Sequence, residues 1–456
     1  MSAIEELVSY TLGLRYEDLP YEVVKVVKKS VLDTLSAIMA GSSSESPEKV
    51  ISLVREWGGS AEGTIFVYGD KLPLPNAAWA NSAMVRGFDF DEVHMPGAGH
   101  TSATVVPSAL AISEYSQAFK SKPINGRDLI VAIALGNDLS CRLRLAGDID
   151  LKWLAEPFTI LAVAAVGGKL LDFNNEKIHN ALGIAYFQCF GNLGASIGKG
   201  GGMMAIVGQG LSAKAGVLSV LLADRGITAQ KEIIDGNLGI YAVYGNGEYN
   251  SELLVGDLGK RFESAKSTIK PYPGCGFTQT TIYGTIELAK EHNIREEDVA
   301  KVILRVSEFA YSVCGDKKGK PASKADALWN YPYTTAVALI KGNVTVDDFT
   351  DEAIGDPRVL ELLQKVTVEI VPDQSLNSSS QIEIVTNDNR SYRKAVDYHK
   401  GHYLNPISWD ELTEKFRSCN HFSAKPFPRE NVESLIQMVE KLEEVENVTK
   451  IVSLLS

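Results

Sequence analysis

Residues 211–224 read LSAKAGVLSVLLAD, a segment that is apolar on almost every face of a helix and rich in small residues. A helix of this kind belongs in the middle of a bundle, because its neighbours can cover all of its faces and small side chains allow close approach. Residues 157–171 have the same character. The two segments therefore predict a helical bundle with a buried centre.

The rest of the chain before about residue 265 also shows helical periodicity. Apolar residues recur at helical spacing from Val24 to Ile38, and Gly41 follows as a stop signal. A second buried helix is predicted over residues 101–118, with Pro107 near its first turn. This part of the chain is predicted to be mainly helical.

The pattern changes after residue 265, where three short segments alternate apolar and polar residues as half-buried strands do. These segments are KVILRVS (301–307), KVTVEIV (365–371) and QIEIVTN (381–387). Helical stretches are predicted at 279–292, 332–341 and 357–364. From Pro406 onward the sequence is helical again, and we expect the last helix to pack on the first region.

The predicted fold class is mainly α, with a large all-helical domain formed by both ends of the chain. We expect its first part to span residues 1–265 and its C-terminal return to span 401–456. Residues 266–400 are expected to form a smaller, inserted α+β domain.

The composition is that of a globular protein, with 456 residues, 45% of them hydrophobic and 22% charged. The formal net charge of −12 argues against nucleic acid or an anionic membrane as a partner, since both require a basic surface. An acidic protein can still bind a small anion through a few local cations, because charges farther away than about 8 Å are screened.

The five cysteines show no CxxC motif or Cys/His cluster, so no zinc or iron–sulfur site is predicted and no metal or cofactor is expected. Their odd number is typical of free thiols in a reducing compartment. The N-terminus does not resemble a signal peptide, and the apolar stretch PFTILAVAAVGG (157–168) is too short to cross a membrane. We expect a cytoplasmic protein.

The first candidate site is RGFDFDEVHMPGAGHTS, residues 86–102. Asp89 and Asp91 alternate with aromatic residues, and a loop rich in glycine ends at His100. Carboxylates beside a histidine suit acid/base chemistry, and a histidine just before a helix lies where anions are attracted. Alternatively, the aspartates cap a turn and His100 is only a residue at the start of the helix.

The second candidate is FGNLGASIGKGGG, residues 190–202, in which six glycines surround Lys199. This loop could bring a cation to an anionic substrate, or it could be a surface loop without function. The chain has neither a GxxxxGK[ST] phosphate loop nor a GxGxxG motif after a strand, so a nucleotide is not indicated.

Two further motifs lie in the smaller domain or at its entrance. IKPYPGCGFTQT (269–280) holds Lys270 and Tyr272 in a loop stiffened by two prolines, and it reads equally well as a hinge. DALWNYPY (326–333) could place the Tyr333 phenol in a cleft or in the core. Arg142 and Arg144 are two residues apart, so only one should face a given pocket.

Taken in order, these loops resemble the MmgE/PrpD family, which includes 2-methylcitrate dehydratases, cis-aconitate decarboxylase and iminodisuccinate epimerase. The DFD…H…S…P and KPYPxC patterns together are specific to this family. The matching stretches are VLDTLSAIMAG (31–41), GFDFDEVH (87–94), GHTSATVVPSALAISE (99–114), GVLSVLLADRGITA (216–229), IKPYPGCGFTQTTIYGTIELA (269–289), ADALWNYPYTTAVALIKG (325–342) and NPISWDELTEKF (405–416).

The resemblance implies that the inserted α+β domain is a lid over the helical domain, with the active site between them, and that the protein is a homodimer. It implies catalytic roles for Asp89, His100, Lys270 and Tyr333. The candidate substrate-binding residues are Arg142, Lys199, Ser102, Tyr272 and Gln279. Where the family usually has Lys, His, His and Thr, this chain has Ala205, Gly208, Gln279 and Val93.

Members of the family remove or add a proton on a carbon next to a carboxylate, so the resemblance implies a small di- or tricarboxylate substrate and no cofactor. We expect His100 to act as base or acid, Asp89 to orient it, and Lys270, with Lys199 or Arg142, to bind carboxylate. The leading hypothesis is a hydro-lyase. The alternatives are an isomerase, a decarboxylase of the cis-aconitate type, and a carboxylate-binding relative without activity.

Overall fold

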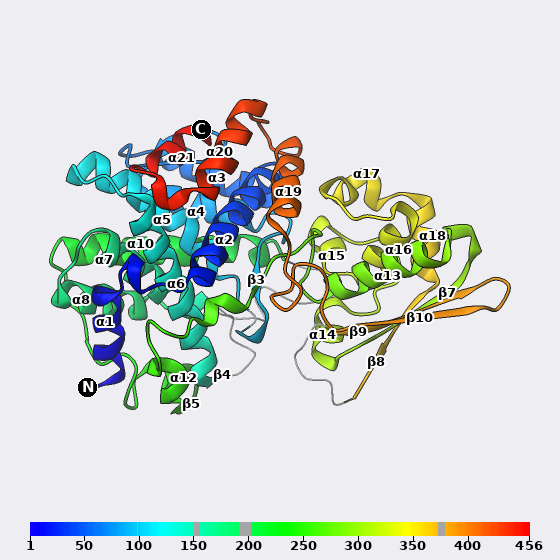
Figure 1. The fold of residues 1–456 in the computed structure, drawn as a ribbon, viewed down its shortest axis with the longest axis horizontal. Helices are drawn as coiled ribbons and strands as arrows, with labels where there is room; N and C mark the ends of the chain where they lie inside the picture. Colours follow the sequence, from blue (N-terminus) through cyan, green and yellow to red (C-terminus); the bar gives the residue numbers. More distant parts are fainter. Residues whose placement is uncertain (98, 150–155, 191–201, 373–378) are drawn as a thin grey trace.

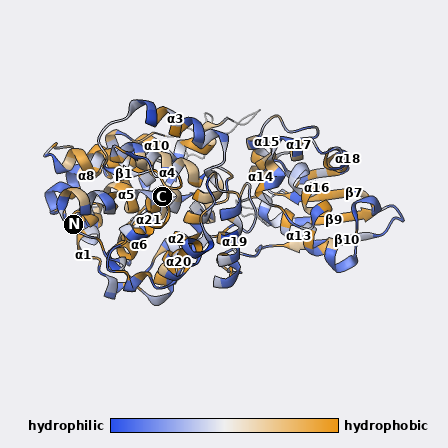
Figure 2. Cartoon of the chain, turned by 90° about the horizontal axis from the view of Figure 1, so that it is seen from above, coloured by the Kyte–Doolittle hydropathy of each residue, from blue (hydrophilic) through white to orange (hydrophobic). Residues whose placement is uncertain are grey.

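The computed structural model describes residues 1–97, 99–149, 156–190, 202–372 and 379–456, and it shows a mainly α protein built from two lobes (Figure 1). This confirms the predicted fold class. The larger lobe, here called the helical body, contains both chain termini. The smaller lobe, made of residues 278–396, contains a four-stranded sheet with helices packed on it. Figure 2 shows both lobes from above, with apolar residues concentrated on the inner helices and on the strands.

The helical body is arranged around α10 (Met204–Asp224), which carries the opening sequence motif. This helix packs against α4 (Leu74–Val85), α5 (Thr101–Lys120), α7 (Glu156–Leu170) and α8 (Asn175–Phe187). The remaining body helices before the smaller lobe are α1 (Ala3–Gly13), α2 (Tyr21–Gly41), α3 (Glu45–Trp57), α6 (Gly126–Ala146), α11 (Ile240–Tyr244) and α12 (Ser251–Val255). Three two-stranded pairs join loops of the body: β1 (Gly63–Thr64) with β2 (Lys71–Leu72), β3 (Val93–His94) with β6 (Ser267–Thr268), and β4 (Gly147–Ile149) with β5 (Gly245–Tyr249).

The smaller lobe is built on the strand order β10-β9-β7-β8, in which only β7 and β8 run parallel. The strands are β7 (Val299–Val306), β8 (Val366–Ile370), β9 (Ser380–Thr386) and β10 (Ser391–Val396). The helices are α13 (Thr278–His292), α14 (Glu308–Cys314), α15 (Lys324–Leu328), α16 (Tyr331–Lys341), α17 (Asp351–Ile354) and α18 (Pro357–Gln364). Helix α13 packs on β9 and β10, and α16 packs on α13, so one face of the sheet is covered.

The C-terminal segment returns to the helical body as α19 (Trp409–His421), α20 (Arg429–Glu440) and α21 (Thr449–Leu454). Helix α19 packs along α2, and α21 packs on α5. In Figure 1 α19 stands at the side of the body that faces the smaller lobe. The expected return of the chain to its first region is therefore confirmed.

Most predicted elements lie within a few residues of the observed ones, with two differences. Pro107 lies in the second turn of α5, because this helix begins at Thr101. Strand β10 was not predicted, since its sequence SYRKAV exposes most of its residues at the edge of the sheet and offers little apolar alternation.

Helix α10 is long and apolar enough to cross a membrane by length and composition alone. The expectation that no segment could do so considered only the shorter apolar stretch at 157–168. In the structure α10 packs among four other helices of the body, which is where a core helix of this composition is expected.

The two segments that connect the lobes meet in a close backbone contact at Gly401. The N–H of Ile269 donates to the carbonyl of Gly401 (2.9 Å), and Gly401 has a φ of 96°. A Cβ at this position would lie 2.0 Å from the Ile269 carbonyl oxygen. Only glycine fits here, for reasons of both conformation and space.

We predict that Gly401→Ala destabilises the protein by about 1–3 kcal/mol more than Gly319→Ala, because only the first substitution adds a steric clash. Gly319 is a suitable control, since its φ of 119° imposes a similar backbone cost and a Cβ there would meet nothing within 4 Å. Urea unfolding of both variants measures the difference in the free energy of unfolding. Equal losses of stability in the two variants would show that the contact between Gly401 and Ile269 is not tight.

Candidate active site

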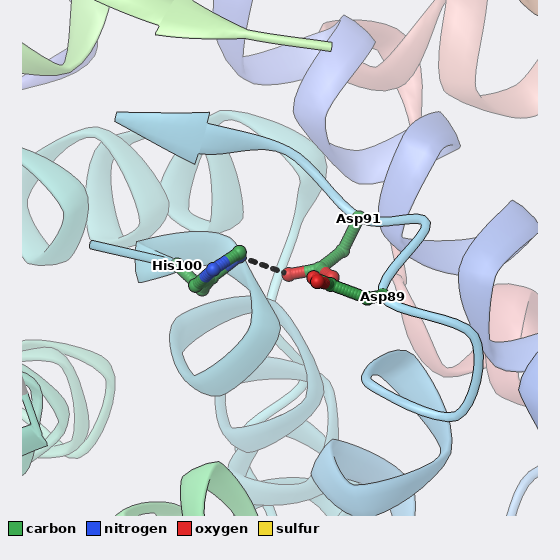
Figure 3. A group of neighbouring side chains, drawn as sticks. All are labelled: Asp89, Asp91 and His100. Carbon is green, nitrogen blue, oxygen red and sulfur yellow. Dashed lines mark hydrogen bonds and ion pairs between the residues drawn. The ribbon is translucent and has the colours of Figure 1, made fainter. Parts of the chain in front are cut away.

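The candidate site is built on the turn that follows α4 and leads into α5. Arg86 caps the end of α4, and Asp89 adopts a left-handed conformation with a φ of 48°, which aspartate tolerates better than most residues. This bend points the side chains of Asp89 and Asp91 toward His100, the N-cap residue of α5 (Figure 3). The three side chains therefore converge although up to eleven residues separate them in sequence.

Arg86 holds the two carboxylates together. Its Nη1 lies 2.5 Å from Asp89 Oδ1 and 2.5 Å from Asp91 Oδ1, and all three residues are buried. Burial raises the pKa of both carboxyl groups, but Arg86, His100 and Lys270 together outweigh it, so the pKa of each is below its ordinary value. Both aspartates are therefore ionised, and their charge is balanced within the core.

Asp91, and not Asp89, is the carboxylate that contacts His100. The Nδ1 of His100 lies 3.0 Å from Asp91 Oδ2 and 3.0 Å from the Glu92 carbonyl oxygen. Two oxygen acceptors at this distance favour the tautomer with the proton on Nδ1, although Arg86 Nη1 also lies 2.9 Å away. The expected pairing of His100 with Asp89 is therefore corrected to Asp91 (Figure 3).

The Nε2 atom of His100 is the ring nitrogen that the surrounding side chains leave without a hydrogen bond in the described part of the chain. No described residue forms a hydrogen bond with it, and the side chain keeps 18% of its surface exposed. Burial lowers the pKa of His100 and the charge of Arg86 lowers it further, against the opposing effect of Asp91. A neutral imidazole with its proton on Nδ1 presents a lone pair at Nε2 and can act as a base.

Asp89 connects the helical body to the loop at the entrance of the smaller lobe. Lys270 Nζ donates to Asp89 Oδ1 (2.6 Å) and to the Asp89 carbonyl (2.7 Å), and Trp329 Nε1 donates to Asp89 Oδ2 (2.7 Å). Lys270 is completely buried. The aspartate turn and the lysine of the proline-rich loop thus meet, as the sequence predicted.

A second buried lysine, Lys415 on α19, reinforces this joint from the C-terminal segment. Its Nζ donates to Asp33 Oδ1 (2.7 Å), to the Phe90 carbonyl (2.7 Å) and to the Lys270 carbonyl (2.9 Å). The same ammonium lies 3.7 Å from the centroid of the Phe90 ring. Both ends of the chain and the proline-rich loop therefore hold the aspartate turn in place.

Asp89, Asp91 and His100 could each offer one ligand atom to a metal ion, since these atoms lie within 4.8 Å of one another. The guanidinium of Arg86 contacts all three side chains at 2.5–2.9 Å and so stands where a shared cation would be. This arrangement fits a site whose positive charge comes from the protein itself.

Three other predicted site residues lie close to this centre or in its loops. Ser102, in the first turn of α5, accepts a hydrogen bond from Asn137 Nδ2 (2.8 Å). Gln279 Nε2 donates to the carbonyl of Tyr272 (3.1 Å), so it closes the proline-rich loop on itself. Burial, with smaller contributions from Tyr283 and Glu287, raises the pKa of Tyr272 to about 12.

Two predicted site residues use their hydrogen-bonding groups in other parts of the protein. The Tyr333 hydroxyl, buried in the smaller lobe, donates to the Asp348 carbonyl and packs near Phe349. The guanidinium of Arg142 donates to Asp138 (2.7 Å) and to four backbone carbonyls of residues 253–261. We therefore leave both out of the proposed site. Lys199 lies outside the described residues.

Two important residues, Arg86 and Trp329, were not singled out from the sequence. Both lie inside stretches that the sequence did mark, since Arg86 opens RGFDFDEVH and Trp329 precedes NYPY. The spacing of three residues between Arg86 and Asp89 was a usable signal for the ion pair between them. No sequence pattern indicates that the indole of Trp329 reaches Asp89, 240 residues away.

Comparison with known proteins gives two family matches and a set of relatives. The MmgE/PrpD N-terminal domain matches residues 5–252, and the MmgE/PrpD C-terminal domain matches residues 272–444. Cis-aconitate decarboxylase of Mus musculus is 28% identical, covering 100% of this chain and 93% of that protein. Cis-aconitate decarboxylase of Aspergillus terreus (strain NIH 2624 / FGSC A1156) is 25% identical over 99% of this chain and 95% of its own length. 2-Methylcitrate dehydratase of Salmonella typhi is 22% identical over 91% of this chain and 89% of its own length.

We predict that Arg86→Met destabilises the protein by about 3–5 kcal/mol, because it leaves two buried carboxylates without their main counter-charge. Arg417→Met, on the surface of α19, is the matched control and should cost less than about 1 kcal/mol, although Arg417 also contacts two carboxylates. Chemical denaturation at pH 7 measures both changes. A loss for Arg86→Met as small as that of the control would contradict the buried charge balance.

Proposed function

This chain belongs to the MmgE/PrpD family, and on that premise we propose that it is a cofactor-independent hydro-lyase of small di- or tricarboxylates, such as citrate or 2-methylcitrate analogues. It matches a cis-aconitate decarboxylase over 100% of its length and a 2-methylcitrate dehydratase over 91%. One observation carries the hydro-lyase proposal, namely the imidazole of His100 with Asp91 at Nδ1 and an unoccupied Nε2.

In this mechanism His100 Nε2 takes a proton from the carbon next to a substrate carboxylate. The electron pair left on that carbon forms a double bond to the adjacent carbon, which releases its hydroxyl group, and the hydroxyl takes up a proton from solvent and leaves as water. Asp91 stabilises the imidazolium that forms on His100 and fixes the orientation of the ring. The substrate loses one water molecule, and His100 returns its proton to solvent.

The developing negative charge on the carboxylate requires donors close to His100. The first turn of α5 begins directly after His100, and the N–H groups of a helix's first turn have no acceptor within the helix. Lys270 uses two hydrogen bonds on Asp89, and an ammonium group has three N–H donors. We assign the carboxylate next to the reacting carbon to these donors.

Decarboxylation of a cis-aconitate-like acid is the second candidate, and the names of the relatives favour it, since those matching the whole chain include cis-aconitate decarboxylases. In that reaction the C–C bond to CO₂ breaks and the carbon that gains the electron pair takes up a proton. His100 must then start protonated and act as an acid. The two reactions therefore need opposite protonation states of the same residue.

We predict that His100→Asn lowers kcat at least about 100-fold, because a positioned acid or base contributes roughly 10²–10⁴ in rate. The assay follows citrate, 2-methylcitrate, cis-aconitate and iminodisuccinate in heavy water by NMR and mass spectrometry. His421→Asn, at an exposed position on α19, is the control and should keep full activity. An unchanged rate in His100→Asn would refute the assignment.

The pH profile of the same assay separates the candidates. The pKa of His100 lies below its usual value of about 6.5, so its basic form predominates at neutral pH and is lost as the pH falls through that pKa. Dehydration should therefore decline on the acid side, whereas decarboxylation should decline as the pH rises. Incorporation of deuterium from solvent without loss of water or CO₂ would indicate an isomerase. Binding without exchange would indicate a relative without activity.

We also propose that the protein is a homodimer, because two large apolar side chains are exposed on neighbouring segments of the body. Phe187, at the end of α8, is 91% exposed, and Leu238 is 81% exposed. The hydroxyl of Tyr186, the neighbour of Phe187, donates to the Leu238 carbonyl (2.6 Å), so the segments that carry the two side chains are in contact. Exposed apolar patches commonly mark interfaces.

We predict that Phe187→Asp converts the dimer to a monomer, since it buries an unpaired charge in the contact. Tyr21→Asp on α2 is the control, because Tyr21 is 71% exposed and lies on a different helix. Light scattering coupled to gel filtration gives the mass of each variant. A dimer that survives Phe187→Asp would place the interface elsewhere.

The five cysteines are all free thiols in the structure. Unpaired cysteines are usual in a reducing compartment, which supports the proposal that the enzyme works in the cytoplasm.

A further inference from the structure

The C-terminal end of helix α6 carries two arginines, Arg142 and Arg144, whose surroundings differ sharply. Arg142 is completely buried and donates to Asp138, one helical turn earlier, and to carbonyl groups of the segment 253–261. Its charge and its donors are used within the protein. Arg144, two residues later, projects from another side of the helix, because successive residues are rotated by about 100°.

Arg144 lies on the side of α6 that faces the candidate site. Asn137, seven residues earlier and therefore on the same face, donates to Ser102 in the first turn of α5. Helix α6 also packs against η2 (Met95–Gly97), the turn that leads to His100. A Cβ added at Gly97 would lie 3.5 Å from Cγ of Arg144, so the stem of Arg144 covers this turn.

The turn that Arg144 covers also touches the proline-rich loop at the entrance of the smaller lobe. A Cβ at Gly276, in this loop, would lie 3.4 Å from Met95 Sδ and 3.4 Å from Val93. The segment 93–97 is therefore held between Arg144 on one side and the loop of Lys270 on the other. This places Arg144 beside the turn that leads to His100.

No residue of the described chain accepts a hydrogen bond or forms an ion pair with the guanidinium of Arg144. The side chain is nevertheless half-buried, and burial lowers the pKa of Arg144 with no acidic group to oppose it. A partly desolvated cation without a partner is unfavourable unless an anion binds to it and offsets the lost hydration. Its position in the last turn of α6 lets the helix dipole offset only part of this cost.

We propose that Arg144 binds a substrate carboxylate other than the one next to the reacting carbon, and thereby selects acids with a distant second or third carboxylate. The proposal rests on the function proposed above, since it assumes that the substrate reacts at His100. A guanidinium suits this task because its planar donors match a carboxylate in a bidentate pair. Arg144 is then a specificity residue, and His100 performs the proton transfer.

The test compares Arg144→Gln and Arg144→Lys with the wild-type enzyme. For a tricarboxylate substrate, we expect Arg144→Gln to raise KM about 10–100-fold while kcat changes less than about threefold, the loss expected for one charged hydrogen-bonded pair. Arg144→Lys keeps the positive charge but cannot donate two parallel hydrogen bonds to a carboxylate. Its KM should therefore lie between those of the wild-type enzyme and Arg144→Gln. For a substrate that lacks the distant carboxylate, all three enzymes should have the same kcat/KM.

Arg127→Gln is the matched control, because Arg127 lies on the same helix, is exposed and should leave KM unchanged. Stabilisation of each folded protein by citrate in a thermal shift assay provides a readout that does not need turnover. Circular dichroism checks that the variants are folded. Loss of the citrate shift in Arg144→Gln, but not in Arg127→Gln, supports the proposal.

A wild-type KM and citrate shift in Arg144→Gln, combined with loss of turnover in His100→Asn, would overturn the role of Arg144 and leave the proposed function intact. A wild-type protein that turns over none of the acids would instead refute the proposed function. In that case the citrate shift alone decides whether Arg144 binds a carboxylate. A variant that loses only thermal stability, with KM and shift unchanged, would show a purely structural role.

Discussion

The carboxylate of Asp89 receives donors from three distant parts of the chain. Arg86 comes from the end of α4, Lys270 from the proline-rich loop, and Trp329 from the smaller lobe, with contact distances of 2.5–2.7 Å. An isolated buried carboxylate is very costly, so Asp89 is stable only when these groups are assembled around it. The contact between the lobes and the geometry of the candidate site therefore depend on the same charge.

Within this network, Arg86 and Asp91 set the properties of His100. Arg86 shares its Nη1 between Asp89 and Asp91, and Asp91 in turn holds Nδ1 of His100. The positive charge of Arg86 opposes protonation of the imidazole, and Asp91 favours it. A histidine placed between these influences can accept a proton and return it, which is the property that both candidate reactions require.

The positive charges near the site divide into two groups with different tasks. Arg86, Lys270 and Lys415 are buried and contact carboxylates and carbonyls of the protein. Arg144 is half-buried, and no described group accepts from its guanidinium. A protein with a net charge of −12 can thus bind an anionic acid, because the local arrangement of a few cations outweighs distant screened carboxylates.

The sequence by itself determined the helical body, the strands β7, β8 and β9, and the two loops that meet at the site, because hydrophobic periodicity and turn-forming residues are local properties. It did not reveal the edge strand β10, whose residues are mostly exposed. Only the tertiary structure decided that Asp91 orients His100 while Asp89 binds Lys270, and that Tyr333 and Arg142 are used inside the protein. Asp89 and Asp91 are two residues apart on one turn and look alike in the sequence. Their roles differ because distant partners, such as Trp329 from 240 residues away, contact Asp89 and not Asp91.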